Sequence, residues 1–277
     1  MASGNIMLIT GVSSGFGRAL AQEALAAGHT VVGTVRSAQA AQDFESLSAQ
    51  AAVARVLDVT DFERIDGVVA EIEANVGPVD VLVNNAGYGH EGIMEEAPLA
   101  EMRHQFDVNV FGAVAMMKAV VPFMRVRRRG RILNITSMGG HITMPGIAYY
   151  CGSKFALEGI SDTLRQELEP FGIAVTAVAP GSFRTDWAGR SMARTPRTIT
   201  DYDALFDPIR KAREEKSGKQ LGDPAKAARA MLAAIAAERP PAHLLLGSDA
   251  LRLVRSKLAA LEEEIRAWEA VTVSTDG

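Results

Sequence analysis

The chain has 277 residues, of which 48% are hydrophobic, and carries a formal net charge of −4. This length fits one large α/β domain or two small ones, and the hydrophobic share is enough for a sizeable core. A net negative charge gives no reason to expect a nucleic acid or an anionic membrane as the main partner. One basic cluster precedes an apolar run and is interpreted as a solvated helix end, with an anion contact or a subunit salt bridge as the alternative; it comprises Arg125, Arg127, Arg128, Arg129 and Arg131.

The number of cysteines, the spacing of the histidines and the length of the apolar runs bear on which classes of protein are expected. The single cysteine, Cys151, excludes an intrachain disulfide and a cysteine-rich metal site. No basic leader opens the chain, and no uninterrupted apolar run reaches the roughly 18 residues of a transmembrane helix. We therefore expect a cytoplasmic protein without a membrane partner. The five histidines lack ligand spacing, so no metal site is expected, although folding could bring distant ones together; they are His29, His90, His104, His141 and His243.

Short apolar runs alternate with helical patterns along most of the chain. Strands are expected at residues 5–10, 30–35, 52–57, 79–83, 131–136, 173–179 and 242–246. Helices are expected at residues 19–28, 38–49, 61–76, 98–124, 146–169, 224–238 and 248–270. This alternation implies an α/β fold with a Rossmann-like, doubly wound parallel sheet of about seven strands and helices on both faces. No linker divides the chain, so residues 1–277 are expected to form a single domain.

Residues 182–222 interrupt the alternation, and no regular strand is expected there. A long insertion after the carboxyl end of a strand is typical of a substrate lid, with an ordinary surface excursion as the alternative. Its large side chains would either suit a fairly apolar substrate or simply pack the lid; they include Trp187, Met192, Tyr202 and Phe206. The C-terminal helix at 248–270 is expected to expose a charged face.

Tyr150 and Lys154 are four residues apart and would share one face of the helix at 146–169. A neighbouring cation favours the phenolate and lowers the pKa of a tyrosine, which would let Tyr150 act as a general acid or base. Alone the pair is a weak signal, because a tyrosine and a lysine on one helix face are more often a packed ring and a solvated amine. Tyr149 has Ser153 at the same spacing, so Tyr150 is the catalytic candidate.

A glycine-rich turn follows the first expected strand. Gly11, Gly15 and Gly17 would permit close approach of the backbone, and the helix after them would present free N–H groups to a diphosphate. No acidic residue lies between Glu23 and Asp43 to bind the adenosine ribose, as is common in NAD enzymes. Arg36 instead follows the second strand and could bind a 2′-phosphate, so NADP is expected to be preferred over NAD; a solvated arginine is the alternative.

Taken in order, the motifs resemble those of the one-domain short-chain dehydrogenase/reductase family. The resemblance covers residues 5–185 and rests on Thr10-Gly11-x-x-x-Gly15-x-Gly17, Asn84-Asn85-Ala86-Gly87, Asn109, Ser137, Tyr150-x-x-x-Lys154 and Pro180-Gly181. It implies an oxidoreductase that interconverts a carbonyl and an alcohol by hydride transfer. Tyr150 would be the general acid or base, and Lys154 would lower its pKa and bind the nicotinamide ribose. Ser137 would bind the substrate oxygen, and Asn109 would hold a water of the proton relay.

The same resemblance implies a set of cofactor contacts. For Asp58 and Asn85, a turn-forming role is about equally expected. The contacts are Gly11, Ser13, Ser14, Gly15, Phe16, Gly17, Arg36, Asp58, Val59, Asn85, Ala86, Gly87, Tyr150, Lys154, Pro180, Gly181 and Thr185. The substrate face would be built from Tyr88, Gly89, His90, residues 139–144 and the insertion at 182–222.

The expected partner is a small-molecule carbonyl or alcohol. A homo-dimer or homo-tetramer is expected through the helices at 98–124 and 147–169, where Ala156 and Gly159 would permit close helix approach or pack on the sheet. One alternative function is an NADP(H)-binding sensor or regulator without turnover, which would not need the complete Ser–Tyr–Lys set. Another is an epimerase or dehydratase, which would need a larger C-terminal domain.

Overall fold

A seven-stranded parallel sheet forms the centre of the computed structural model, which describes residues 4–185, 189, 191–216 and 218–277. The strand order is β3-β2-β1-β4-β6-β7-β9. Each of these strands begins and ends within one residue of its expected position. The strands are β1 (Ile6–Ile9), β2 (Thr30–Val35), β3 (Ala52–Val56), β4 (Val79–Asn84), β6 (Gly130–Ile135), β7 (Ile173–Pro180) and β9 (His243–Leu246).

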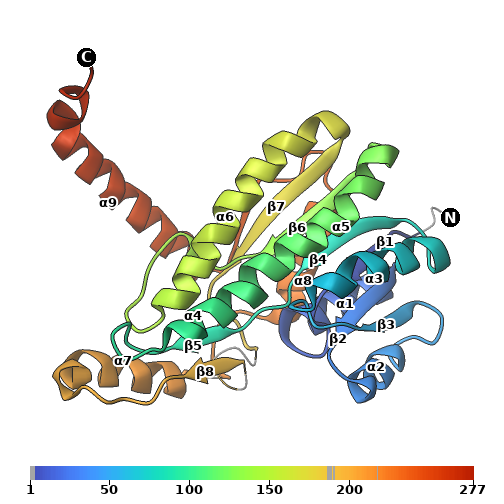
Figure 1. The fold of residues 1–277 in the computed structure, drawn as a ribbon, viewed down its shortest axis with the longest axis horizontal. Coiled ribbons are helices and arrows are strands. Elements are labelled where there is room, and N and C mark those ends of the chain that lie inside the picture. Colours follow the sequence, from blue (N-terminus) through green and yellow to red (C-terminus); the bar gives the residue numbers. More distant parts are fainter. Residues whose placement is uncertain (1–3, 186–188, 190, 217) are drawn as a thin grey trace.

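Helices cover both faces of the sheet (Figure 1), because successive residues of a strand point to opposite sides. In β1, Met7 and Ile9 enter the core beneath α1 (Gly15–Ala26), α2 (Ala38–Glu45) and α8 (Pro224–Ala236). Leu8 enters the core beneath α3 (Phe62–Asn75), α5 (Gly112–Arg127) and α6 (Ala148–Leu168). The structure thus confirms the expected doubly wound, Rossmann-like fold.

The long helix expected at 98–124 is interrupted. It consists of α4 (Leu99–Phe106), a π-helical turn (Asp107–Phe111) and α5. Such turns are rare and occur frequently at functional sites. Here the turn contains Asn109, which is 1% exposed.

One helical stretch of the described residues, Leu99–Arg127, is long and apolar enough to cross a membrane on length and composition alone. Its apolar side chains Met116, Val120 and Met124 are fully buried in the core beneath α3, α5 and α6. Packing on the sheet therefore accounts for the apolar composition of this stretch.

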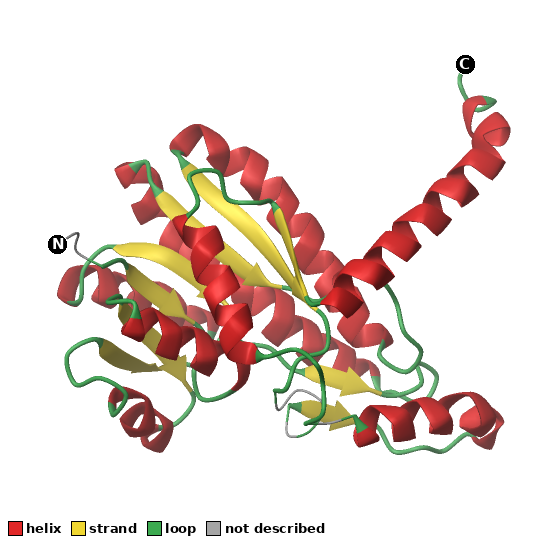
Figure 2. Cartoon of the chain, turned by 180° about the vertical axis from the view of Figure 1, so that it is seen from behind, coloured by secondary structure: helices red, strands yellow, loops and turns green. Residues whose placement is uncertain are grey.

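The insertion at 182–222 contains regular structure, so the expectation of no strand there was wrong. β8 (Met192–Arg194) pairs in parallel with β5 (Gly89–Glu91), and α7 (Asp203–Glu215) follows. This small sheet and α7 lie at the end of the molecule toward which the strands of the main sheet point (Figure 2). Trp187 lies outside the described residues.

The C-terminal helix α9 (Ser248–Val273) is three residues longer than expected. Its first turns bury Ala250 and Val254, whereas every residue from Arg255 onward is exposed. The helix projects away from the rest of the molecule (Figures 1 and 2). Its exposed surface includes apolar side chains as well as the expected charges, among them Leu258, Ile265 and Trp268.

Candidate active site

The candidate site lies at the carboxyl ends of the central strands. The strand order reverses between β1 and β4, and ligands of open α/β sheets bind in the crevice at such a point. The predicted motifs lie at this edge. Those that begin at Thr10 and Ser137 follow β1 and β6, and those that begin at Asn84 and Pro180 start on the last residues of β4 and β7.

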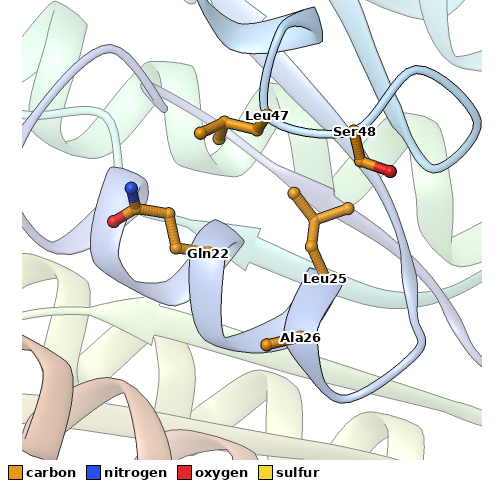
Figure 3. A pocket seen from close by; sticks show the side chains of 5 residues that line it. All are labelled: Gln22, Leu25, Ala26, Leu47 and Ser48. Atoms are coloured by element: carbon orange, nitrogen blue, oxygen red, sulfur yellow. The ribbon is translucent and has the colours of Figure 1, made fainter.

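A hollow of about 300 Å³ lies elsewhere, beside the last turns of α1 (Figure 3). Gln22, Leu25, Ala26, Leu47 and Ser48 line it, and none of them is ionisable. Because α1 returns toward the start of the next parallel strand, its last turns lie at the opposite edge of the sheet from the motifs. This hollow offers no group for acid–base chemistry.

The glycine-rich turn packs directly against the start of α1. Gly11 has a φ of +73°, which favours glycine, and a Cβ at Gly17 would lie 2.3 Å from the Gly11 carbonyl oxygen. Ser14 occupies the N-cap of α1 without a side-chain capping bond. The first N–H groups of α1 have no partner within the helix, so they can bind an anion.

Asn85 and Thr10 hold this turn in place. The Asn85 amide group donates to the carbonyl oxygens of Thr10 (2.9 Å) and Gly11 (3.0 Å). The Thr10 hydroxyl in turn accepts the backbone N–H groups of Asn85 and Ala86, both at 2.9 Å. The donors of the Asn85 side chain thus serve the turn, which is the turn-forming role considered for this residue.

Arg36 is exposed directly after β2, and Asp58 is exposed after β3. Burial tends to raise the pKa of Asp58, but hydrogen bonds from the Thr60 N–H (3.0 Å) and hydroxyl (2.7 Å), together with the charge of Arg36, hold this pKa below its usual value. Val59 is buried, and a Cβ at Gly112 would lie 2.9 Å from its side chain. Arg36 is therefore an accessible cation beside the adenosine end expected for the cofactor.

The segment after β7 closes over the glycine-rich turn. Phe183 packs against Phe16 with ring centroids 5.1 Å apart, and a Cβ at Gly15 would lie 3.9 Å from the Thr185 Cβ. Gly181 donates its N–H to the Leu246 carbonyl oxygen at 2.8 Å, which fixes the exit from β7 against β9. Cofactor candidates from the two halves of the sheet thus face one another.

Ser137 and Lys154 both lie close to Tyr150. A Cβ at Gly139 would lie 3.3 Å from Tyr150 Cε1 and 3.4 Å from Ser137 Oγ. Lys154 Nζ lies 5.8 Å from the centroid of the Tyr150 ring and donates to the Ile135 carbonyl oxygen at 2.8 Å. All three residues are buried, with 6–9% of their surface exposed. The sequence spacing had indicated the Tyr–Lys pair, and the fold adds the serine.

Burial lowers the pKa of Lys154 from 10.5 to about 8, although the negative charge of Glu158 opposes this shift. An amine with this pKa carries a positive charge at neutral pH in most molecules. The cation is thus held inside the protein next to the Tyr150 ring.

Asn109 lies beside the same group. Its Nδ2 donates to the Tyr88 carbonyl oxygen (3.0 Å) and lies 3.1 Å from the Ser153 hydroxyl, while its Oδ1 accepts the Tyr88 N–H (3.1 Å). A Cβ at Gly87 would lie 3.0 Å from Asn109 Oδ1 and 3.7 Å from Lys154 Nζ. The π-helical turn therefore brings Asn109 close to Lys154, with Gly87 between them.

Several residues of the expected substrate face have packing roles. The Tyr149 hydroxyl donates to the Ala97 carbonyl oxygen (2.8 Å), and its ring stacks on that of His90. His90 Nε2 contacts the Thr195 hydroxyl at 2.9 Å. Burial, with the charges of Glu101 and Asp107, raises the pKa of Tyr88 to about 12.

Buried carboxylates anchor the insertion, and sequence reasoning missed them. The Glu91 side chain is 1% exposed and contacts Arg194 (3.2 Å), Arg210 (3.6 Å) and Arg213 (2.5 Å). The Arg197 side chain likewise bridges Glu96, Asp203 and Asp207 at 3.0, 2.8 and 2.7 Å. The insertion is thus joined to the segment after β4 by ion pairs.

Met192, Tyr202 and Phe206, the large side chains singled out in the insertion that the structure describes, have packing or hydrogen-bonding roles. Met192 and Phe206 are 6% and 1% exposed, and the Tyr202 hydroxyl donates to Glu95 at 2.6 Å. The alternative that these side chains simply pack the lid fits this arrangement, so they give no support to an apolar substrate.

A Rossmann-like sheet with a glycine-rich turn and a buried Ser–Tyr–Lys group at its carboxyl edge defines a dinucleotide-dependent oxidoreductase. Residues 5–195 match the family model described as short chain dehydrogenase, and the chain belongs to the short-chain dehydrogenase/reductase family.

Curated relatives match almost the whole chain. Oxidoreductase BOA17 of Botryotinia fuckeliana is 33% identical over 98% of both chains. The 3-ketodihydrosphingosine reductase of Bacteroides thetaiotaomicron is 38% identical over 87% of both. The NADPH-dependent 3-dehydrocapnine reductase of Ornithobacterium rhinotracheale is 34% identical over 88% of both.

Solved structures agree with this assignment. A short-chain dehydrogenase from Streptomyces avermitilis is 42% identical over the full length of both chains, with a TM-score of 0.93. A short-chain dehydrogenase/reductase from Burkholderia phymatum in complex with NAD has 25% identity and a TM-score of 0.81, covering 95% of both chains. A variant of ElxO with NADPH bound has 25% identity and a TM-score of 0.72, covering 88% of this chain and 96% of its own. A nicotinamide cofactor is therefore supported.

Proposed function

We propose that this protein is an NADP(H)-dependent reductase that converts a ketone to a secondary alcohol, with Tyr150 as the proton donor. The observation that carries the proposal is the placement of Tyr150 beside both Ser137 and Lys154, at the carboxyl edge of the parallel sheet. The glycine-rich turn, with its close backbone approach and open helix N-terminus, fits a dinucleotide diphosphate.

A bound nicotinamide would supply the hydride, and the protein would supply position and the proton. As negative charge develops on the carbonyl oxygen, the Tyr150 hydroxyl would donate its proton to that oxygen. The Lys154 ammonium would favour the resulting phenolate through its positive charge. Ser137 Oγ already accepts the Gly139 N–H at 3.0 Å, so its own proton is available to hydrogen-bond the substrate oxygen.

Asn109 would support the proton relay through the backbone of the π-helical turn rather than through its side chain. All three hydrogen-bonding contacts of that side chain go to Tyr88 and Ser153. These contacts hold the turn near Lys154, where a water bound to the backbone could return a proton to Tyr150 by way of the lysine and the cofactor ribose.

We further propose a substrate with its ketone at position 3 of a longer chain. Two of the curated relatives are named as reductases of 3-ketodihydrosphingosine and 3-dehydrocapnine. A third, FabG of Escherichia coli, is a 3-oxoacyl-[acyl-carrier-protein] reductase. A 3-oxo compound is the chemistry that these names share.

The test follows NADPH absorbance over a panel of 3-oxo sphingoid bases, 3-oxoacyl thioesters and simple ketones. Tyr150→Phe should lower kcat by a factor of about 10² to 10⁴, the range for losing a general acid. The matched control is Tyr149→Phe, which removes the neighbouring hydroxyl and should leave kcat near that of the wild type. Full activity in Tyr150→Phe would refute the mechanism. Cofactor binding without turnover on any member of the panel would favour the sensor.

Preference for NADP rests on Arg36. Its exposed guanidinium follows β2, and the NADPH-dependent relative shows that this cofactor is used within the matched set. The ratio of kcat/KM for NADPH to that for NADH should fall by about tenfold or more in Arg36→Ala, as expected for loss of a charge-assisted bond of about 1.5–3 kcal/mol. Arg229→Ala, which removes an exposed arginine paired with Glu23, is the control. An unchanged ratio in Arg36→Ala would refute the assignment.

We propose a homo-dimer or homo-tetramer formed through α4, α5 and α6. Phe155 on α6 is 42% exposed, and Phe111, which directly precedes α5, is 53% exposed. Gly159, one turn beyond Phe155, is exposed, and a Cβ there would have no atom within 4 Å. It therefore does not pack on the sheet and leaves room for another helix.

Light scattering should show a lower mass for Phe155→Ser than for the wild type. Phe62→Ser, which replaces an equally exposed ring on α3, is the control and should leave the mass unchanged. A monomeric wild type would refute the proposal. A cytoplasmic location without nucleic-acid or membrane partners stays a prediction.

A further inference from the structure

We propose that His141, Glu158 and His243 form a binding site for a divalent transition-metal ion, with Zn²⁺ as the preferred ion. One ligand atom from each of these side chains lies within 4.8 Å of both others. Their sequence positions give no hint of this arrangement, because His243 is 85 residues from Glu158. The proposal is independent of the reductase mechanism.

The three side chains come from three parts of the fold. His141 follows the short 3-10 turn Met138–Gly140 after Ser137, Glu158 lies on α6, and His243 opens β9. Glu158 lies between the two histidines: Oε1 is 3.2 Å from His141 Nε2, and Oε2 is 3.1 Å from His243 Nδ1.

These distances fit a metal site. With metal–ligand bonds of about 2.0–2.2 Å, tetrahedral ligands lie roughly 3.3–3.5 Å apart. The two N···O distances are near this range, although they involve different oxygens of Glu158, and the wider separations in the group, which are at most 4.8 Å, would shorten around an ion. Two imidazole nitrogens and one carboxylate select Zn²⁺ and its neighbours, because Mg²⁺ and Ca²⁺ prefer all-oxygen sites. Three protein ligands leave a fourth position for water, as in zinc sites of the His₂Glu type.

The polar atoms around the cluster are arranged to support such an ion. His141 Nε2 is buried and lacks a hydrogen bond of acceptable geometry to any described residue, although the carboxylate is close. A metal ion between them would give this nitrogen a partner. The Thr136 hydroxyl donates to Glu158 Oε1 at 2.5 Å and orients the carboxylate.

His243 has its second nitrogen, Nε2, 4.0 Å from Asp162 Oδ1. A carboxylate near the second nitrogen of a ligating histidine is the usual support of a metal site. The exposed fraction of the side chains rises from 9% for Glu158 to 21% for His141 and 43% for His243, so the ion would enter past His243.

Because the ligands come from the segment after Ser137, from α6 and from β9, the ion would link three parts of the fold. It would join the last strand of the sheet to the helix that carries Tyr150 and Lys154. It should therefore stabilise the folded protein, because metal bound only by the folded state shifts the unfolding equilibrium.

The experiment uses tag-free, full-length protein stripped of metal with EDTA. Titration with ZnCl₂ should show one ion bound per chain and a rise in Tm. CoCl₂ should give the visible absorption of tetrahedral Co²⁺ rather than that of the aqueous ion. In His243→Gln the Zn²⁺ affinity should fall by about tenfold or more, since even residues that only orient a ligand have effects of that size.

His29→Gln is the matched control, because His29 is remote in the fold and accepts the Asn5 N–H at 3.1 Å. It should bind Zn²⁺ as the wild type does. His243 is substantially exposed, so its replacement is expected to fold, and His141→Gln provides a second variant with the same expected loss. Equal Zn²⁺ affinity in the wild type, His243→Gln and His141→Gln would overturn the proposal. An octahedral Co²⁺ spectrum in the wild type would overturn it as well.

Discussion

Replacement of Lys154 by methionine should stabilise the cofactor-free protein at neutral pH while it abolishes turnover. The ammonium group is buried, and burial lowers the pKa of Lys154 from 10.5 to about 8. The buried charge therefore lowers the stability of the folded protein, but it lies next to Tyr150, where the proposed mechanism requires it. Methionine has a similar length without the charge.

The two pKa values give the size of the effect. Their difference corresponds to about 3 kcal/mol, at roughly 1.4 kcal/mol for each pKa unit. Loss of the bond from Lys154 Nζ to the Ile135 carbonyl oxygen offsets about 1 kcal/mol of this gain. Lys154→Met should thus raise the free energy of unfolding by about 2 kcal/mol at pH 7.

The direction of the Lys154 pKa shift also determines how the stability depends on pH. Below pH 8 the amine is charged in both states, so the wild type bears the whole cost. Between about pH 8 and 10.5 the folded chain releases the proton before the unfolded chain does, and the stability of the wild type rises with pH. Methionine cannot titrate, so the advantage of the variant should shrink from pH 7 to pH 10.

Urea unfolding of both proteins at pH 7 and pH 10, in EDTA and without nicotinamide, measures this difference. The explanation would be refuted if Lys154→Met were less stable than the wild type at pH 7 and the difference in stability were the same at pH 10. Burial of the Lys154 charge would then not destabilise the folded protein.

Three further substitutions test the core, the turn and the lid. Phe44→Ala removes a fully buried ring from the core beneath α1, α2 and α8, and urea unfolding should show a free energy of unfolding lower by about 3–5 kcal/mol. Phe62→Ala, at an exposed ring, is the control and should change this free energy little. Similar losses in the two variants would contradict the assigned burial. Asn85→Ala removes two hydrogen bonds to the glycine-rich turn, each worth about 1 kcal/mol. NADPH binding, measured by fluorescence titration, should weaken roughly tenfold. An unchanged affinity would argue against the role of Asn85 in positioning the turn. Glu91→Gln leaves three arginines without their buried carboxylate and should destabilise the insertion by about 3 kcal/mol. Limited proteolysis within residues 191–216 should then be faster than in the wild type. Equal cleavage rates would show that the ion pairs do not anchor the insertion.

The sheet could be predicted from the sequence because its signals are local. Each strand is a short run rich in apolar residues, and a parallel sheet buried on both faces requires such runs. The Tyr150–Lys154 pair was equally accessible, since helical spacing alone places both on one face. Ser137 required the family resemblance, because only the fold brings it to Tyr150.

Features that depend on distant pairing were not accessible in this way. β5 and β8 have three residues each, and their pairing joins Gly89 to Met192. The histidines at 141 and 243 meet only because β9 lies beside β7. The π-helical turn at Asn109 leaves the apolar pattern of the expected helix almost unchanged, so the periodicity did not predict it.

The outer part of α9 has a stability that is separate from that of the sheet. Most of the stability of helices in proteins comes from tertiary packing, and every residue from Arg255 onward is exposed. In an isolated chain, the backbone amides of this stretch should exchange with solvent deuterium much faster than those of α5 or α6. If copies of the chain associate through the apolar residues of the outer part of α9, exchange there should slow as the protein concentration rises. Exchange in the core of the sheet should stay constant. The concentration dependence of exchange in α9 would therefore report on association without any substitution.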